Sequence, residues 1–142
     1  MPEKKLKGIG GWLLLYLILL SIGQIISLIS ILLVILGEAY FLDSNLNPGT
    51  LLIILFLGFI AIFKTIKKSK KAKKWNLEFL WLLILITFLS EAWKISHVDF
   101  SDPIKELWFI EGISTIFWTT LHSVIWIIYW KKSERVKNTF VN

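Results

Sequence analysis

The last apolar stretch of this sequence carries the residue types that could support chemistry inside a membrane. His122 lies near the middle of the stretch, and Glu111 lies near its start. At 100° per residue, these two side chains share one helical face with Ser114, Thr115, Trp118, Thr119, Trp126 and Tyr129. An imidazole and a carboxylate on one face could relay protons or bind a cation, because ionisable groups are expensive to keep in lipid.

Two other apolar stretches carry shorter polar faces that could meet this one. The third stretch offers Thr87, Ser90, Glu91 and Lys94, and the first offers Ser21, Gln24, Ser27 and Ser30. The candidate intramembrane polar site therefore comprises His122, Thr119, Thr115, Glu111, Glu91 and Gln24. The plainer interpretation is that these groups only join helices, with Gly23 and Ser27 allowing close approach and Trp118 serving as a packing residue. The sequence favours helix packing, and His122 is the strongest functional candidate because it lies deepest.

The composition assigns these faces to a membrane protein. Hydrophobic residues make up 56% of the 142 residues, and the mean hydropathy is +0.69, above what is usual for a soluble domain. A soluble core of this size could not bury so many apolar side chains, whereas lipid can surround them. The net charge of +6 would suit nucleic acid if the bases formed one patch, but they alternate with apolar stretches, so we expect no nucleic-acid partner.

The apolar stretches predict an all-α polytopic protein, with four transmembrane helices in an antiparallel bundle that forms a single domain over residues 1–142. We expect the spans at about 9–36, 48–67, 76–95 and 110–130. The first span would be about 42 Å long, which exceeds a ~30 Å hydrocarbon core and predicts tilt or projection from the membrane. A basic cytoplasmic tail over residues 131–142 follows the last span.

Local signals suggest where these helices begin. Pro48 and Pro103 suit the first turn of a helix, and Asn76 is a candidate cap for the third span. Residues 103–111 could form a short interfacial helix or the outer end of the last span. Gly112 is the cheapest position for a bend between the two.

The distribution of basic residues predicts the orientation. Fourteen of the sixteen Lys and Arg residues fall in three segments: Lys4, Lys5 and Lys7; Lys64, Lys67, Lys68, Lys70, Lys71, Lys73 and Lys74; and Lys131, Lys132, Arg135 and Lys137. Positive charge is retained in the cytoplasm, so we expect both termini inside. The central lysines then set topology, and attraction to anionic lipid headgroups is a consequence of their charge.

Several classes of chemistry lack the residues they need. The chain contains no cysteine, which excludes disulfides and thiolate chemistry. Residues 97–102 hold one histidine and two aspartates, which is too weak a pattern to predict a metal site. The glycines at residues 8–11 follow no strand, so they are not a dinucleotide fingerprint. We find no catalytic motif and expect neither a catalytic site, a metal nor a cofactor.

The two ends of the chain resemble a known family. The opening Gly8-Ile9-Gly10-Gly11-Trp12-Leu13 and the closing Ile125-Trp126-Ile127-Ile128-Tyr129-Trp130, followed by Ser133-Glu134-Arg135-Val136-Lys137-Asn138-Thr139-Phe140-Val141, are similar to bacterial membrane proteins catalogued as domain of unknown function 2569. The resemblance implies four spans and a bacterial cytoplasmic membrane. It implies no reaction, substrate or catalytic residue.

The resemblance also draws attention to the tail as a cytoplasmic lipid or partner contact. Arg135 and Lys137 could hold a lipid phosphate, while Val136 and Phe140, at i and i+4, could dock on a membrane or a partner. The alternative is a tail that only stops transfer. For the whole chain we expect a non-enzymatic component that acts through protein or lipid partners, with homo-oligomerisation as one form of partnership. The alternative is a small oligomeric transporter or channel lined by the polar face around His122.

Overall fold

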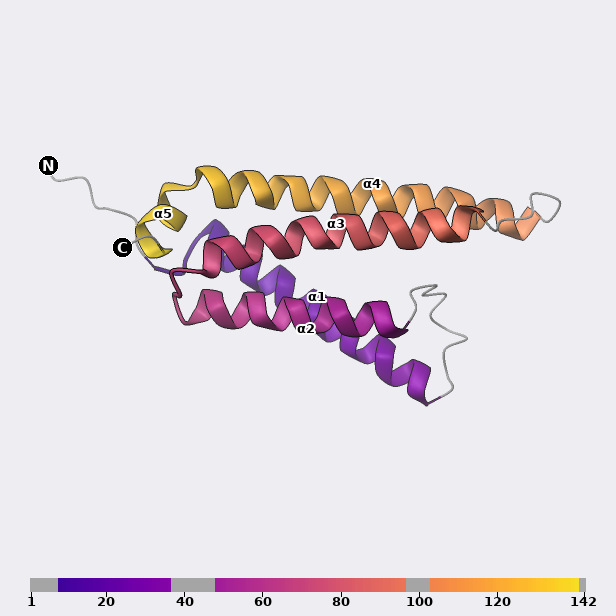
Figure 1. The fold of residues 1–142 in the computed structure, drawn as a ribbon, viewed down its shortest axis with the longest axis horizontal. Coiled ribbons are helices and arrows are strands. Elements are labelled where there is room, and N and C mark those ends of the chain that lie inside the picture. Colours follow the sequence, from indigo (N-terminus) through magenta and orange to yellow (C-terminus); the bar gives the residue numbers. More distant parts are fainter. Residues whose placement is uncertain (1–7, 37–47, 97–102, 141–142) are drawn as a thin grey trace, which may run out of the picture.

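Five α-helices make up the part of the chain that the computed structural model describes, which is residues 8–36, 48–96 and 103–140. They are α1 (Trp12–Ile35), α2 (Pro48–Ile66), α3 (Ala72–Ser96), α4 (Pro103–Lys132) and α5 (Glu134–Phe140). Helices α1 to α4 run along one long axis in alternating directions, and α5 lies across one end of the bundle (Figure 1). The predicted all-α architecture is confirmed.

The four long helices expose most of their apolar surface. Each is long and apolar enough to cross a membrane, and only 17% to 28% of the residues in each apolar window are buried inside the chain. Exposing this much apolar surface to water would cost free energy, whereas exposing it to the hydrocarbon of a membrane does not. The helices are therefore packed together as a bundle whose outer surface suits lipid.

Helix α3 begins earlier than the sequence suggests. It starts at Ala72, whose backbone N–H donates to the carbonyl of Ser69 at 2.8 Å. Lysine is a good helix former, so the lysines after Ala72 extend the helix instead of ending in a loop. Asn76 consequently lies within the first turns of α3, and its expected role as the helix cap is wrong.

Helix α4 is one continuous helix from Pro103 through Gly112 to Lys132. Residues 103–111 are thus continuous with the last span and do not form a separate short helix, and the expected bend at Gly112 is absent from α4. Pro103 and Pro48 are the first residues of their helices, in the positions where proline costs no backbone hydrogen bond.

A tight turn joins α2 to α3. Lys68 has a φ of 49°, and the N–H of Ser69 donates to the carbonyl of Lys64 at 3.0 Å. A left-handed residue followed by this long-range bond is the Schellman closure of a helix C-terminus. We call the end of the bundle that carries this turn, Gly8 and α5 the basic end, and the opposite end the far end.

Aromatic side chains fill the core at the basic end. The ring of Tyr16 lies 4.9 Å from that of Trp126 and 5.5 Å from that of Trp130. Trp130, which is fully buried, also lies 5.4 Å from the ring of Phe140. Helix α5 thus completes this cluster, because Val136 and Phe140 are both almost fully buried.

A buried hydrogen-bonded network ties three helices together beside this cluster. The Tyr16 hydroxyl donates to Asn76 Oδ1 at 2.8 Å, and Asn76 Nδ2 donates to Thr65 Oγ1 and to the carbonyl of Ala72, both at 2.8 Å. Thr65 in turn donates to the carbonyl of Ala61 at 2.8 Å. Every polar atom of the Asn76 carboxamide therefore has a partner, which is what burial of an amide requires.

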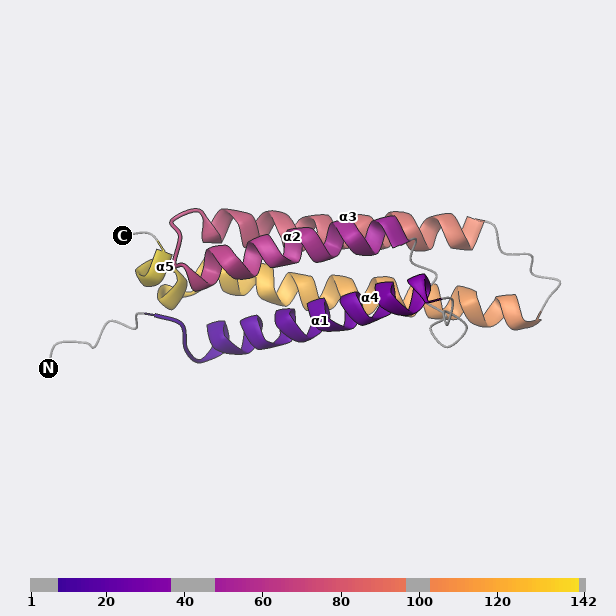
Figure 2. The ribbon, with the colours of Figure 1, turned by 90° about the horizontal axis from the view of Figure 1, so that it is seen from below.

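The bundle opens toward the far end. In Figure 1, α1 starts close to α4 at the basic end and then crosses behind α2, away from α3 and α4. Figure 2 shows the same four helices at right angles to that view, and α1 again starts beside α4 at the basic end. The α1–α2 and α3–α4 pairs therefore form a V that is closed at the basic end.

Candidate functional site

A cavity of about 400 Å³, with both apolar and polar side chains in its wall, lies between the arms of the V. All four long helices contribute to its wall, which consists of Ser27 from α1, Leu51 and Ile54 from α2, Leu83, Thr87 and Glu91 from α3, and Thr115, Trp118, Thr119 and His122 from α4. Six of these ten side chains carry a hydroxyl, a carboxylate or an imidazole. Polar groups at this depth must meet protein, water or a ligand, because lipid chains cannot satisfy them.

The cavity exists because α1 packs on α4 only near the basic end. There the ring of Trp126 lies 6.5 Å from that of Trp12 and 4.9 Å from that of Tyr16. Farther along, α1 diverges from α4 (Figure 1). The polar face of α4 is therefore left uncovered in the far half.

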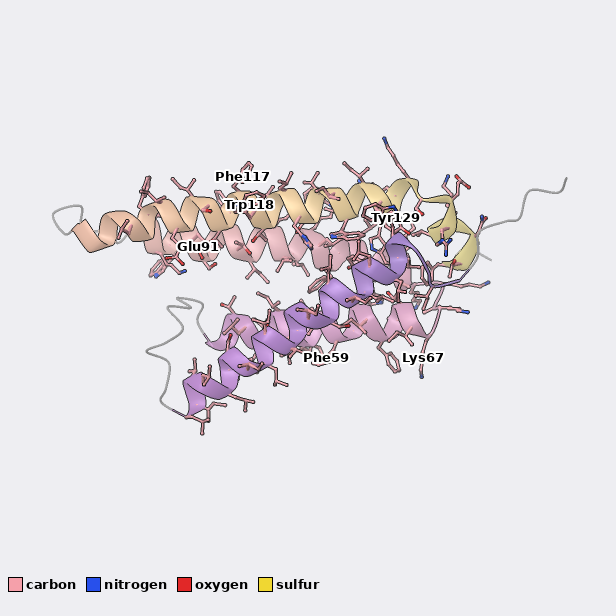
Figure 3. The ribbon with its side chains drawn as sticks, turned by 180° about the vertical axis from the view of Figure 1, so that it is seen from behind. Phe59, Lys67, Glu91, Phe117, Trp118 and Tyr129 are labelled. Carbon is pink, nitrogen blue, oxygen red and sulfur yellow. The ribbon has the colours of Figure 1, made fainter. Side chains whose placement is uncertain are left out.

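Glu91 is held at the wall of the cavity by its neighbours on α3 and α4. Its side chain is almost fully buried, and its Oε1 accepts from Lys94 Nζ at 2.9 Å (Figure 3). A Cβ added to Gly112 would lie 3.2 Å from Glu91 Oε2 and 3.3 Å from Ile95 Cδ1. The absence of a side chain at Gly112 is thus what lets this carboxylate lie against α4.

His122 lies at the middle of α4 and is exposed within the chain. Its ring packs at 6.1 Å against that of Trp126, in an edge-to-face arrangement that leaves the two ring nitrogens free to bind other groups. No hydrogen bond joins His122 to another residue of the described ranges. Trp118, one turn away on the same face, is 63% exposed, so the prediction that it is a packing residue of this chain is wrong.

The two ends of the chain meet at the basic end. The N–H of Gly8 donates to Thr139 Oγ1 at 2.9 Å, and Thr139 Oγ1 donates to the Gly8 carbonyl at 3.5 Å. The Arg135 guanidinium lies over Gly10, where an added Cβ would be 2.7 Å from its Nη1. These contacts join the segment before α1 to α5.

Comparison with known proteins identifies a family for this chain. The family model described as protein of unknown function DUF2569 matches residues 6–141. The chain belongs to the DUF2569 family. Neither a curated protein nor a solved structure matches it. The match begins just before the Gly8 segment and ends just after α5, so the DUF2569 match includes both of the segments that meet at the basic end.

The structure of this DUF2569 protein brings together most of the predicted intramembrane site. Glu91, Thr115, Thr119 and His122 all line the cavity. Glu111 is exposed nearer the far end of the same α4 face and does not line the cavity. Whether these groups relay protons or bind a cation stays a prediction.

Gln24 lies outside the cavity wall. Its side chain is 4% exposed and occupies the space beside Gly58, where a Cβ would overlap the carboxamide. Its Oε1 is buried and accepts no hydrogen bond from the described residues. Gln24 thus joins α1 to α2 by packing, as the plainer interpretation proposed.

The predicted tail contact needs one correction. Phe140 is 1% exposed and Val136 is fully buried, so neither is available to a membrane or a partner. Sequence spacing placed the two side chains on one face, but the nearby Trp130 gives that face a partner within the chain. Arg135 and Lys137 remain candidates, although Lys137 Nζ forms an ion pair with Glu134 Oε1 at 2.7 Å.

The Tyr16–Asn76–Thr65 network was not foreseen from the sequence. Asn76 was read as a helix cap because it stands between lysines and an apolar stretch. Ser123 was also missed: it is fully buried, and its Oγ forms no hydrogen bond within the described ranges. A usable signal was the short distance of Asn76 from a predicted membrane interface, where a buried amide needs a partner from another helix.

The described ranges were also compared with the ligand arrangement that a metal ion needs. No group of three His, Asp or Glu residues there is arranged to hold a metal ion. Residues 97–102, whose one histidine and two aspartates form only a weak metal pattern, lie outside the described residues, as do Lys4, Lys5 and Lys7. The cavity wall carries hydroxyls, the Glu91 carboxylate and the His122 imidazole, all of which can form hydrogen bonds.

Proposed function

We propose that this DUF2569 protein is a non-enzymatic component of the bacterial cytoplasmic membrane that binds a helix of a membrane-embedded protein along the polar face of α4. The observation that carries the proposal is the exposure of this face within the candidate span. Ser114, Trp118 and His122 are all exposed within the chain, although lipid cannot satisfy their polar groups.

The spacing of this face favours a helix as the partner. Glu111, Thr115, Trp118 and His122 are separated by four, three and four residues, which is the spacing of a helix-packing seam. The seam is about 16 Å long at the standard helical rise. A partner helix can cover that length and hydrogen-bond across it, whereas a small molecule in the cavity would leave Glu111 and Ser114 uncovered.

The orientation follows from charge and is part of the proposal. The basic end carries the central lysines and the α5 residues Arg135 and Lys137, and positive loops are retained in the cytoplasm. On this basis both termini lie in the cytoplasm, and the V opens toward the outside. A cytoplasm-only reporter fused after Asn142 should be active, and one inserted near Asn45 should be inactive.

The cavity supports a second candidate, a small transporter or channel. Its wall includes the polar side chains of Thr115, Thr119 and His122, and groups of this kind could line a solute path. Oligomerisation around the α4 face would then enclose a pore. This candidate requires that water fill the cavity.

Cysteine labelling separates the two candidates, since the chain has no cysteine of its own. Thr119→Cys and His122→Cys place thiols at the cavity wall, and Val124→Cys places one at the same depth on the opposite side of α4, where the residue is 38% exposed. A water-soluble thiol reagent applied to native membranes should leave all three unreacted if a partner helix covers the face. Reaction at residues 119 and 122, with protection at 124, would favour the transporter.

A photo-crosslinking amino acid tests the partner itself. Placed at Trp118 in native membranes, it should give one discrete protein adduct, and placed at Val124 it should give none. An adduct of twice the chain mass identifies the partner helix as a second copy. Reaction with lipid alone at both positions would contradict the proposal.

A further inference from the structure

Two apolar grooves run along the outside of α2 and α3 on either side of Trp75. One, of about 560 Å³, is lined by Phe56, Phe59, Ile60, Phe63, Lys64 and Trp75. The other, also about 560 Å³, lies between Leu57 and the α3 side chains Trp75, Glu78, Phe79, Trp81, Leu82 and Leu85. Trp75 is the one residue that both walls share.

The grooves have the depth of a single membrane leaflet. On α3 the second groove extends from Trp75 to Leu85, which is about 15 Å at the helical rise. Half of a ~30 Å hydrocarbon core is the same length. Both grooves reach the basic end, where Trp75 stands beside the α2–α3 turn.

Positive charge surrounds the mouth of the grooves. Lys64 lines the first groove directly, and Lys67 Nζ lies 4.3 Å above the ring of Phe63, which also lines it (Figure 3). Neither lysine forms an ion pair with the described residues. The one carboxylate in the two walls, Glu78, lies 3.6 Å from Lys74. The mouth is therefore cationic overall and complements an anion.

We propose that one anionic phospholipid of the leaflet at the basic end straddles Trp75, with one acyl chain in each groove and its phosphate held by Lys64 and Lys67. Two apolar grooves that share a wall match the two chains of one glycerophospholipid. The lysines at the mouth match its phosphate, because a base near an anionic surface attracts it. This site is separate from the α4 face and does not depend on what binds there.

Native mass spectrometry of the purified full chain tests the site. With phosphatidylglycerol as the probe, we expect one lipid retained per chain, and phosphatidylcholine with the same acyl chains should be retained at least about fivefold less. Lyso-phosphatidylglycerol, which has one acyl chain, should also bind more weakly, because it leaves one groove empty. Equal retention of the one-chain and two-chain lipids would overturn the straddling arrangement.

A pair of matched double variants tests the role of the lysines. Lys64→Ala with Lys67→Ala should lower phosphatidylglycerol retention by about thirtyfold, which is roughly fivefold per lysine. Lys70→Ala with Lys71→Ala removes the same amount of charge from the neighbouring α2–α3 turn without touching either groove, and it should change retention less than about twofold by the same reasoning. Equal losses in the two variants would show charge attraction without a site and would overturn the proposal.

Blocking one groove tests the acyl chains without altering charge. Ile60→Trp fills the groove lined by Phe59 and Phe63, and we expect phosphatidylglycerol retention to fall to the level of the one-chain lipid. Circular dichroism melts establish that each variant is folded. Unchanged retention in a folded Ile60→Trp variant would also overturn the proposal.

Discussion

The basic end and the rest of the bundle are built from the same four helices, but they differ in whether their polar side chains are buried and hydrogen-bonded or exposed. At the basic end, Asn76 bonds to Tyr16 and Thr65, and aromatic rings fill the space around them. From the middle of α4 toward the far end, His122 and Trp118 stand exposed beside a cavity, where α1 has diverged from α4. The comparison indicates that the basic end stabilises the fold, whereas the far half is available for binding.

Two tryptophans of α4 provide the largest test of this division. Trp130 is fully buried at the basic end, and Trp118 is 63% exposed. We expect Trp130→Ala to lower the free energy of unfolding by about 2–4 kcal/mol, because it leaves a cavity among Tyr16 and Phe140. Trp118→Ala should change it by less than about 0.5 kcal/mol.

The measurement is unfolding in mixed micelles, followed by circular dichroism as the denaturing detergent is increased. Similar losses for both tryptophan variants would mean that the far half also holds the fold. The division between the two regions would then be wrong.

The tail offers the next largest contrast. Phe140→Ala should cost about 2–3 kcal/mol, because its ring packs on Trp130 in the core. Lys137→Ala removes only an exposed ion pair with Glu134 and should cost less than about 0.5 kcal/mol. The same unfolding assay compares the two variants. An unchanged free energy of unfolding for Phe140→Ala would mean that the tail does not pack in the core and is free to dock elsewhere.

Buried amides in the two regions should respond differently to apolar replacement. Asn76→Leu removes the acceptor of the Tyr16 hydroxyl and the donor to Thr65 Oγ1, which keeps only its bond to the Ala61 carbonyl. The change should lower the free energy of unfolding by about 1–2 kcal/mol. Gln24→Met removes an Oε1 that has no partner among the described residues, so stability should stay level or rise. Equal destabilisation by both changes would contradict this prediction, because it would mean that the Gln24 side chain forms a stabilising hydrogen bond.

The smallest effect is expected at the ion pair beside the cavity. Glu91→Gln weakens its contact with Lys94, which is 27% exposed and can reach water, so the loss should be about 0.5 kcal/mol. Binding of the partner helix should change more than stability does. A loss above about 2 kcal/mol in the unfolding assay would instead make Glu91 part of the structural core.

The sequence predicts the helices of this protein well, because membrane crossing depends on local composition. Four apolar stretches correspond to α1–α4, and Pro48 and Pro103 mark the helix starts. Helical periodicity in the sequence also predicts that Thr115, Thr119 and His122 share one face, and all three line the cavity in the structure.

What the sequence could not predict depends on contacts between segments distant in the chain. The partners of Asn76 come from α1 and α2, and the burial of Phe140 depends on Trp130 and on the contact between Gly8 and Thr139. The divergence of α1 from α4 is likewise set by how the helix pairs pack. No pattern within a single helix encodes it.

Distances between spin labels on α1 and α4 test the central claim most directly. Because the chain lacks cysteine, label pairs can be introduced at Leu15 and Ile128 near the basic end, and at Ile35 and Ile110 near the far end, all of which are exposed. Double electron–electron resonance spectroscopy in lipid nanodiscs should give a short, narrow distance distribution for the first pair and a longer, broader one for the second. Two equally short and narrow distributions would contradict the account, because the bundle would then be closed at both ends.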